Sequence, residues 1–113
     1  MIRGYWEDRG IRVVQGWGMT ETHGCAALKP GMGERRIGSI GLRFPFQQMK
    51  TVIVDDDGRY VRDCNVDEIG CVCIKGPNVM KGYWKNPDAT AASMTPDGFF
   101  RTGDVAVMDD DGF

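Results

Sequence analysis

Two acidic turns that interrupt short runs of strand-forming residues restrict the fold of this sequence most strongly. Asp55-Asp56-Asp57-Gly58 directly follows residues 49–54, which are rich in β-branched and apolar side chains. A second run of this kind covers residues 69–75, and a second Asp-Asp-Asp-Gly turn occupies residues 109–112. β-Branched residues favour strands, and Asp-Gly pairs favour tight turns. The spacing therefore predicts that residues 49–54 and 69–75 form two antiparallel strands of a small sheet.

A helix and two more strands are predicted in the rest of this half. Residues 86–88 read Asn-Pro-Asp, and Asp88 is expected to cap a short helix over residues 89–94. Pro96-Asp97-Gly98 is expected to end that helix. Residues 99–102 and 105–108 are predicted to form another strand pair. Because strands and turns alternate at short intervals, we expect a small antiparallel sheet or barrel with one inserted helix.

The first half of the sequence predicts a helix end, a strand and a glycine-rich turn. Residues 1–9 are expected to be the last turns of a helix that is closed by Gly10, since glycine best accepts the left-handed conformation there. Residues 12–15 are predicted to be a short buried strand that leads into a turn at residues 16–21. Residues 29–41 are glycine-rich and irregular, and we expect a subdomain boundary there. The absence of βαβ alternation excludes a complete doubly wound domain, so the predicted fold class is mainly β with short helices (α+β).

Composition limits the size, partners and location of the protein. With 113 residues, of which 42% are hydrophobic, the chain can form one compact domain at most. The 14 Lys+Arg nearly cancel the 16 Asp+Glu and form no basic run, so no nucleic-acid or anionic membrane partner is expected. Neither a signal peptide nor a stretch of membrane-spanning length is visible. We therefore expect a cytoplasmic protein without a transmembrane segment.

The cysteines and acidic turns do not match a metal site. The four cysteines have no regular spacing and are expected to be reduced thiols. A zinc site would need a second closely spaced pair of ligands, which the cysteines and His23 do not supply. The two Asp-Asp-Asp-Gly turns also lack the ligand register of an EF-hand loop. We interpret them as solvated turns.

One motif in the first half carries groups that suit a nucleotide. Gly16-Trp17-Gly18-Met19-Thr20-Glu21 places an aromatic ring, a hydroxyl and a carboxylate close together. A ring can stack on adenine, a Thr hydroxyl can bind a phosphate oxygen, and a Glu can hold the magnesium that accompanies ATP. A tight turn with a capping Thr is the alternative, and the motif alone does not decide between the two.

A second motif ends in an aspartate. In Phe100-Arg101-Thr102-Gly103-Asp104, the carboxylate could accept hydrogen bonds from both hydroxyls of a ribose, as acidic residues do in dinucleotide sites. An aspartate in an ordinary β-turn is the alternative. Between the two motifs lie three glycines at even spacing, Gly70, Gly76 and Gly82, followed by Tyr83. These glycines call for a structural explanation rather than a chemical one.

Together and in order, these strings resemble the motifs of the adenylate-forming superfamily, which includes acyl-CoA synthetases, firefly luciferase and the adenylation domains of peptide synthetases. Residues 16–21 match its aromatic-Gly-x-Thr-Glu motif, residues 70–83 its glycine-rich barrel motif, and residues 100–104 its aromatic-Arg-Thr-Gly-Asp motif. The resemblance implies an internal fragment. Residues 1–28 would end a Rossmann-like ATP- and acyl-binding subdomain and supply one strand of its layer. Residues 29–113 would form a distorted antiparallel β-barrel, and the family's C-terminal domain would be absent.

The same resemblance assigns roles to residues of the first and last motifs. It implies Thr20 and Glu21 as catalytic residues, with Thr20 on the α-phosphate and Glu21 on magnesium. The other residues would bind substrates: Trp17 on adenine, Asp104 on the ribose hydroxyls, Gly16, Gly18 and Met19 close to the nucleotide, and His23 and Gly24 close to the acid.

The implied activity is that of an acyl-CoA synthetase that uses ATP, Mg²⁺ and coenzyme A to activate a carboxylic acid. The strings Trp-Gly-Met-Thr-Glu-Thr and Ile-Gly-Ser-Ile-Gly-Leu look most like synthetases of fatty or other hydrophobic acids. Two positions depart from the family pattern, Trp17 where Tyr is most common and Arg43 where Pro is common.

The family's phosphate loop and catalytic lysine have no counterpart in this sequence. The isolated chain is therefore expected to be inactive, and its exposed surface could make it self-associate. The alternative is a non-catalytic β-barrel module that binds a nucleotide weakly or not at all.

Overall fold

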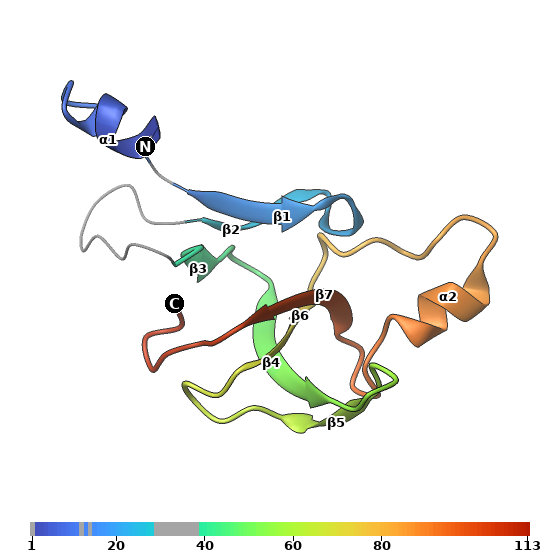
Figure 1. Cartoon of the computed structure of the whole chain (residues 1–113). Helices are drawn as coiled ribbons and strands as arrows, with labels where there is room; N and C mark the ends of the chain where they lie inside the picture. Colours follow the sequence, from blue (N-terminus) through green and yellow to red (C-terminus); the bar gives the residue numbers. More distant parts are fainter. Residues whose placement is uncertain (1, 12, 14, 29–38) are drawn as a thin grey trace.

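The computed structural model describes residues 2–11, 13, 15–28 and 39–113, and these residues are mainly β with two short α-helices (Figure 1). This confirms the predicted fold class. None of the described helices has the length and apolar character that a membrane span requires. In chain order the elements are α1 (Ile2–Glu7), β1 (Gly16–Met19), a 3-10 turn η1 (Thr20–Thr22), β2 (Gly24–Leu28), β3 (Leu42–Arg43), β4 (Gln48–Val54), β5 (Tyr60–Asp63), β6 (Gly70–Lys75), α2 (Pro87–Ala92) and β7 (Phe100–Ala106).

The strands form two antiparallel sheets, one with the order β1-β2-β3 and one with the order β5-β4-β6-β7 (Figure 1). The larger sheet ends in β5 on one side and β7 on the other. A closed barrel would need these edge strands to be paired, so the sheet is open among the described residues, and the predicted distorted barrel is not confirmed. The described strand pairs are all antiparallel, and the assignment of the opening strand to a Rossmann-like layer stays a prediction.

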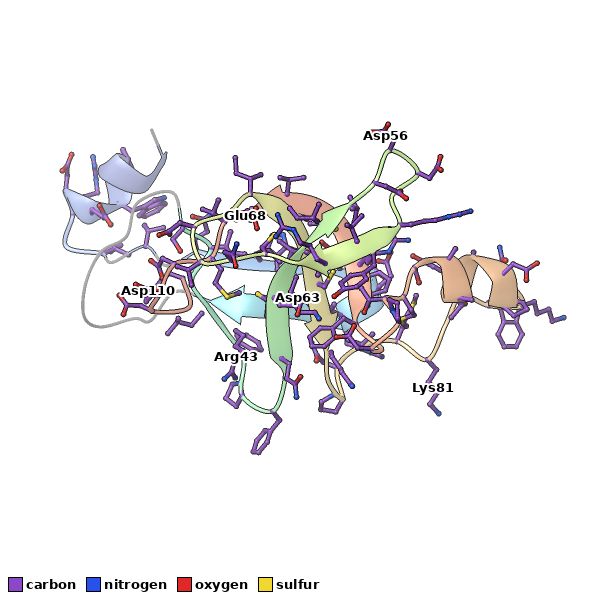
Figure 2. All side chains as sticks on the ribbon, turned by 90° about the horizontal axis from the view of Figure 1, so that it is seen from below. Arg43, Asp56, Asp63, Glu68, Lys81 and Asp110 are labelled. Carbon is purple, nitrogen blue, oxygen red and sulfur yellow. The ribbon has the colours of Figure 1, made fainter. Side chains whose placement is uncertain are left out.

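The predicted strands at residues 49–54 and 69–75 are confirmed as β4 and β6, which pair with each other. The acidic turn after β4 is also confirmed, and Figure 2 shows Asp56 at its tip. Asp55 holds this turn, because its Oδ1 accepts hydrogen bonds from the backbone N–H of Asp57 and Arg59 at 3.0 and 2.9 Å. The chain then returns as β5, a strand that the sequence did not predict.

The hydrophobic core lies on the larger sheet. Val52, Cys73, Ile74 and Phe100 are fully buried there. β6, the strand between β4 and β7, is buried over most of its length. The predicted free thiols are confirmed for Cys64, Cys71 and Cys73. Burial, reinforced by the neighbouring Cys71, raises the pKa of the Cys73 thiol to about 12, so Cys73 is protonated at neutral pH.

Helix α2 begins earlier than predicted, and the expected strand pair after it is one strand. The side chain of Asn86 accepts a hydrogen bond from the backbone N–H of Ala89 at 3.1 Å, so Asn86 and not Asp88 caps the helix. Pro87 takes the first helical position, which needs no N–H donor. The predicted strands at 99–102 and 105–108 are replaced by β7, which runs through residues 100–106 without a turn.

The first half of the chain contains the predicted helix and a shifted strand. Helix α1 lies within the expected range, and Gly10 has the expected left-handed conformation with φ +78°. Of the strand predicted at residues 12–15, Arg12 and Val14 lie outside the described residues, while Val13 and Gln15 are not in a strand. The strand begins instead at Gly16, because residues 16–19 pair with β2. Most of the predicted boundary at residues 29–41 lies outside the described residues.

Candidate nucleotide site

The structure brings together the two motifs that lie farthest apart in the sequence. Nε1 of Trp17 in β1 donates a hydrogen bond to Oδ2 of Asp104 in β7 at 3.1 Å. The two strands belong to different sheets and are separated by 87 residues along the chain. The aromatic ring and the carboxylate that the sequence nominated as nucleotide ligands therefore lie side by side.

The residues before Asp104 anchor β7 to the larger sheet. Phe100 is buried in the core. The guanidinium of Arg101 donates hydrogen bonds to the carbonyls of Gly58 and Ala92, which ties the β4–β5 turn to the end of α2. Thr102 Oγ1 donates to the carbonyl of Val72 in β6 at 2.9 Å. These contacts fix the strand on which Asp104 is presented.

A bulge in β7 displays Asp104 to solvent. Arg101 of β7 pairs with Cys73 of β6, and Val105 pairs with Cys71. Between these two pairs β7 advances by four residues while β6 advances by two. Gly103 lies in this interval with φ +82°, a conformation that glycine adopts without strain. Bulges of this kind redirect a side chain. Asp104 is exposed as a result and can accept further hydrogen bonds.

The sharp turn predicted at residues 16–21 is shorter in the structure, because residues 16–19 belong to β1 and Thr20–Thr22 form one turn of 3-10 helix. The buried hydroxyl of Thr22 donates to the carbonyl of Met19 at 3.0 Å and accepts from the Met19 N–H at 3.3 Å, which closes the turn. Thr20 and Glu21 lie on this turn, Thr20 exposed and Glu21 half-buried. Both side chains therefore follow Trp17 on the same short structure, as the proposed nucleotide motif requires.

Glu21 is held by two contacts with the loop after β6. Its backbone carbonyl accepts a hydrogen bond from the N–H of Met80 at 2.7 Å, and its Oε2 accepts one from the hydroxyl of Tyr83 at 3.0 Å. Burial, together with the nearby Glu21 carboxylate, raises the pKa of Tyr83, which therefore stays a donor at neutral pH. Sequence reasoning did not nominate Tyr83. The available signal was its position directly after Gly82, at the end of the glycine-rich motif of residues 70–83.

His23 is turned toward the same loop. It has a left-handed backbone with φ +58°, and its Nδ1 lies 2.7 Å from the carbonyl oxygen of Asn78. Because a carbonyl only accepts, Nδ1 carries the proton in this contact. Gly24, the next residue, begins β2. The role of His23 and Gly24 beside the acid substrate stays a prediction.

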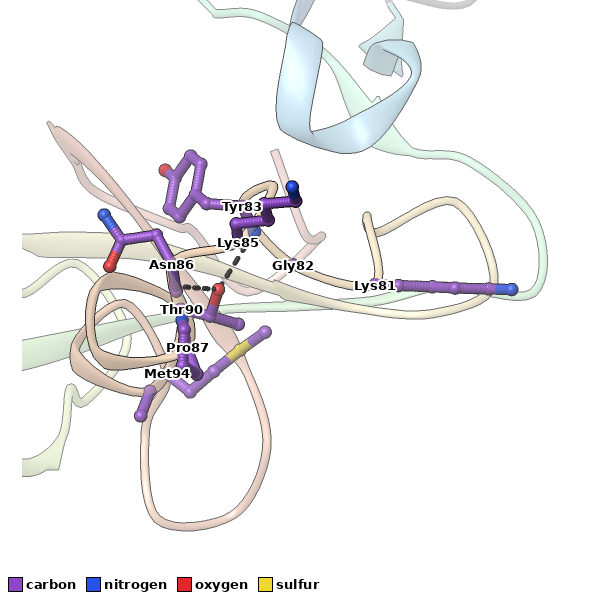
Figure 3. A pocket seen from close by; sticks show the side chains of 9 residues that line it. Lys81, Gly82, Tyr83, Lys85, Asn86, Pro87, Thr90 and Met94 are labelled. Atoms are coloured by element: carbon purple, nitrogen blue, oxygen red, sulfur yellow. Dashed lines mark hydrogen bonds between the residues drawn. The ribbon is translucent and has the colours of Figure 1, made fainter.

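A pocket lies beside Tyr83. It has a volume of about 460 Å³ and is lined by residues 81–83, 85 and 86, by one face of α2 and by Met94 just after it (Figure 3). The hydroxyl of Thr90 accepts a hydrogen bond from the N–H of Tyr83 and donates one to the carbonyl of Asn86, each at 2.9 Å. Lys81 and Lys85 give the pocket a positive charge. Tyr83 thus joins this pocket to the Glu21 side of the site.

The carboxylates at this site suit a magnesium ion that arrives with a nucleotide. Magnesium in such sites is bound by one or two carboxylates, while phosphates and waters supply the other ligands. Glu21 is half-buried and already oriented by Tyr83, so it can supply one such ligand. In the part of the chain that the structure describes, no three His, Cys, Asp or Glu residues gather into a complete metal site.

Comparison with known protein families identifies the family of the chain. The model of the family described as AMP-binding enzyme matches residues 2–84, which is more than half of the chain. The chain belongs to the AMP-binding enzyme family. The matched residues include Trp17, Glu21 and Tyr83, whereas Asp104 lies beyond the match.

Two curated relatives of the chain are CoA ligases. The chain is 36% identical over 113 residues to marinolic acid–CoA ligase of Pseudoalteromonas sp. (strain SANK 73390). This alignment covers 100% of the chain and 17% of the relative. The chain is 43% identical over 104 residues to long-chain-fatty-acid–CoA ligase of Salmonella typhimurium. This alignment covers 92% of the chain and 18% of the relative. The chain thus spans less than one-fifth of the length of these two relatives.

Solved structures show the same fold. ATP-bound MatB from Rhodopseudomonas palustris matches with a TM-score of 0.82 and 34% identity over 91% of the chain and 20% of its own length. O-Succinylbenzoate coenzyme A synthetase (MenE) from Bacillus subtilis, in complex with AMP, matches with a TM-score of 0.81 and 31% identity over 99% of the chain and 22% of its own length.

Proposed function

We propose that the protein carrying this chain is an AMP-forming acid–CoA ligase and that the chain supplies the adenine, ribose and magnesium side of its nucleotide site. The observation that carries this proposal is the contact between Trp17 and Asp104, because it unites the two ligands nominated for the base and the sugar. Family membership and the CoA ligases among the relatives support it.

The proposed reaction has two steps. In the first, a carboxylate oxygen of the acid forms a bond to the α-phosphorus of ATP while the bond from that phosphorus to pyrophosphate breaks, which gives an acyl-adenylate. In the second, the sulfur of coenzyme A bonds to the acyl carbon, AMP leaves, and the thiol proton passes to solvent. The first step brings two anions together, so repulsion between them is the main obstacle.

In this proposal, residues of the chain bind and orient the nucleotide during the first step. The ring of Trp17 stacks on adenine, and Asp104 accepts hydrogen bonds from the ribose hydroxyls. Thr20 would donate to an α-phosphate oxygen, and Glu21, whose carboxylate accepts a hydrogen bond from Tyr83, would hold Mg²⁺. When bound, Mg²⁺ would offset the negative charge of the phosphates. Positioning of this kind can supply a large share of the rate enhancement.

The sequence also motivates narrower proposals about the acid substrate, the subdomains and the cellular location of the enzyme. We propose a fatty or other hydrophobic acid as the substrate, with His23 and Gly24 beside it. We also propose that residues 1–28 end an ATP- and acyl-binding subdomain and that residues 29–113 belong to a barrel completed by other parts of the protein. The proposed location is the cytoplasm and the proposed role is in fatty acid metabolism.

The isolated chain is proposed to lack activity. Since it spans 17–18% of the length of the two CoA ligases compared above, most of the residues that such an enzyme uses would come from outside it. Acid-dependent exchange of pyrophosphate into ATP tests this directly. Exchange by the full-length protein and none by the 113 residues alone is the expected result, and exchange by the isolated chain would show that the proposal of inactivity is wrong.

Glu21→Gln in the full-length protein tests the proposed metal ligand. Because the loss of one electrostatic stabiliser costs about a hundredfold to a thousandfold in rate, the exchange rate should fall by this order. Thioester formation from preformed acyl-adenylate should be affected less, since pyrophosphate no longer takes part. Asp56→Asn, at the exposed tip of the β4–β5 turn, is a control that changes one charge outside the site. Equal losses in both half-reactions would count against the metal role.

Asp104→Ala tests the proposed ribose contact. It should weaken ATP binding more than binding of the acid, because the carboxylate is assigned to the sugar. The affinities of the full-length protein for ATP and for the acid, measured separately by calorimetry, give the comparison. An unchanged ATP affinity would rule out the contact.

A further inference from the structure

We infer that Trp17 is a positioning residue for Asp104: its indole N–H holds the carboxylate beside the stacking ring, where the hydroxyls of a bound ribose can reach it. This inference rests on the proposed function, because it assumes that a nucleotide occupies the site. It assigns the edge of Trp17 a role separate from the stacking role of its face.

The geometry of the contact allows both roles at once. The indole N–H lies in the plane of the ring, so the 3.1 Å hydrogen bond from Nε1 to Asp104 Oδ2 leaves the ring faces available. A carboxylate offers about four acceptor sites, so three remain for two ribose hydroxyls. Among the described residues, no hydrogen bond to Asp104 Oδ1 is found. Trp17 therefore orients Asp104 without exhausting its acceptors.

Asp104 needs such an orienting partner. It is exposed, and it follows Gly103 on the bulge of β7, where the backbone leads away from the regular ladder. Its own backbone N–H is held by Thr102 Oγ1 at 3.2 Å, but among the described residues Trp17 is the group that contacts its carboxylate. An exposed carboxylate without this contact would sample several rotamers and lose entropy when a ribose binds.

The direction of the hydrogen bond also matches the shape of a nucleotide. In a nucleotide the sugar is attached to the edge of the base, so a base stacked on Trp17 places its ribose to the side of the ring rather than over it. A carboxylate held in the plane of the indole lies on that side. The phenol of a tyrosine carries its donor at the tip of a smaller ring, and phenylalanine carries none. Trp17 thus couples recognition of the base to recognition of the sugar.

The test compares two nucleotides in variants of the full-length protein. Trp17→Phe keeps a stacking face and removes the donor, and replacement of Trp17 by 3-benzothienylalanine keeps the size of the indole and removes only the N–H. Calorimetry gives the affinity of each protein for ATP and for 2′,3′-dideoxy-ATP. Both changes should weaken ATP binding about tenfold, the lower end for one hydrogen bond to a charged group, and weaken dideoxy-ATP binding less than about twofold. Trp84→Phe, which alters an 87% exposed indole, is the matched control.

Two results would overturn the inference. Equal weakening of both nucleotides would mean that Trp17 acts through packing alone, and an unchanged ATP affinity in the benzothienyl variant would mean that the N–H has no role. A wild-type protein that binds neither nucleotide would overturn the proposed function, and this inference with it, so the two failures are distinguishable.

A nucleotide-free measurement tests the contact itself. In the ¹⁵N-labelled full-length protein, Asp104→Ala should shift the Trp17 indole N–H resonance upfield and speed its exchange with water. The indole resonance of Trp84 should stay in place. An unmoved Trp17 resonance would overturn the inference without any binding experiment.

Discussion

Gly70→Ala should destabilise the larger sheet because there is no room for a methyl group at this position. Gly70 begins β6 and pairs with Ala106 of β7. A Cβ built on Gly70 would lie 2.3 Å from Cys64 Sγ and 2.6 Å from the backbone oxygen of Val52. The thiol can rotate away. The Val52 carbonyl cannot, since it belongs to the central strand β4, so the paired strands β4 and β6 would have to separate.

The expected cost follows from these two contacts. Overpacking of a well-packed core costs about 1–3 kcal/mol. The smaller entropy of an unfolded chain with alanine offsets about 0.4–1 kcal/mol of this. We therefore expect the free energy of unfolding to fall by roughly 1–2 kcal/mol. Urea unfolding followed by circular dichroism measures it, and each kcal/mol should lower Tm by about 4–8 °C in a domain of about this size.

Two further variants separate steric overlap from a general effect of alanine. Gly4→Ala is the matched control, because Gly4 lies in helix α1 and an added Cβ meets nothing within 4 Å. It should leave stability unchanged or raise it by up to about 1 kcal/mol through helix propensity. Gly70→Ala combined with Cys64→Ala removes the overlap with sulfur and should recover only part of the loss. A wild-type urea midpoint for Gly70→Ala, or full recovery in the double variant, would refute the assigned role of the Val52 carbonyl.

Two other changes test the core and the surface ion pairs. Phe100→Ala, which truncates a side chain that is 1% exposed, should cost about 3–5 kcal/mol in urea unfolding, and a cost below about 1 kcal/mol would contradict its place in the core. Lys50→Met should flatten the acid dependence of stability. Hydrogen bonds from Lys50 and then Thr95 lower the pKa of Asp97 to about 2, so the wild type keeps this stabilisation above the ordinary Asp pKa and loses it as pH falls from about 4 toward 2. Urea midpoints at several pH values should therefore fall less in the variant over that window, and parallel curves would contradict this reasoning.

The elements that were predicted correctly are those whose signals are local. Strands β4 and β6 and the helix that ends before Gly10 are specified by their own residues. Strand β5 was missed because Tyr60-Val61-Arg62-Asp63 lies at the edge of the sheet and mixes polar and apolar residues. Its conformation depends on pairing with β4 more than on its own propensity. Edge strands of this composition give a weak signal in sequence.

The misreading of β7 has a different cause. Gly103 and Asp104 are typical turn residues, and they predicted a break between two short strands. In the structure they form a bulge inside one strand, and the pairing with β6 resumes at Val105. Local sequence does not distinguish a turn from a bulge, because both use glycine at positive φ. The distinction depends on the partner strand.

The candidate site was predicted in its parts but not in its assembly. Trp17, Glu21 and Asp104 were nominated from motifs, and the structure brings Trp17 and Asp104 into contact. Tyr83 was missed because its role comes from a hydrogen bond to a residue 62 positions earlier in the chain. No local pattern specifies such a pair. Residue types can nominate a ligand, whereas the group that orients that ligand emerges only from the fold.

Tyr83→Phe should separate orientation from stability at this site. The variant keeps the ring and removes the hydroxyl that donates to Glu21 at 3.0 Å. Because the pair is near the surface, the free energy of unfolding should change by no more than about 0.5 kcal/mol. If the hydroxyl orients Glu21 toward a metal, the variant should bind ATP more weakly in the presence of Mg²⁺ and as well as the wild type in EDTA.

Calorimetric titrations of the full-length protein in both buffers measure this difference. Tyr60→Phe is the matched control, because its hydroxyl donates at the same 3.0 Å distance to a carboxylate outside the site, that of Asp63. The same loss of ATP affinity with and without Mg²⁺ would show that Tyr83 contacts the nucleotide instead of orienting Glu21. A loss of stability without a loss of affinity would show that the hydrogen bond only joins the loop after β6 to the turn after β1.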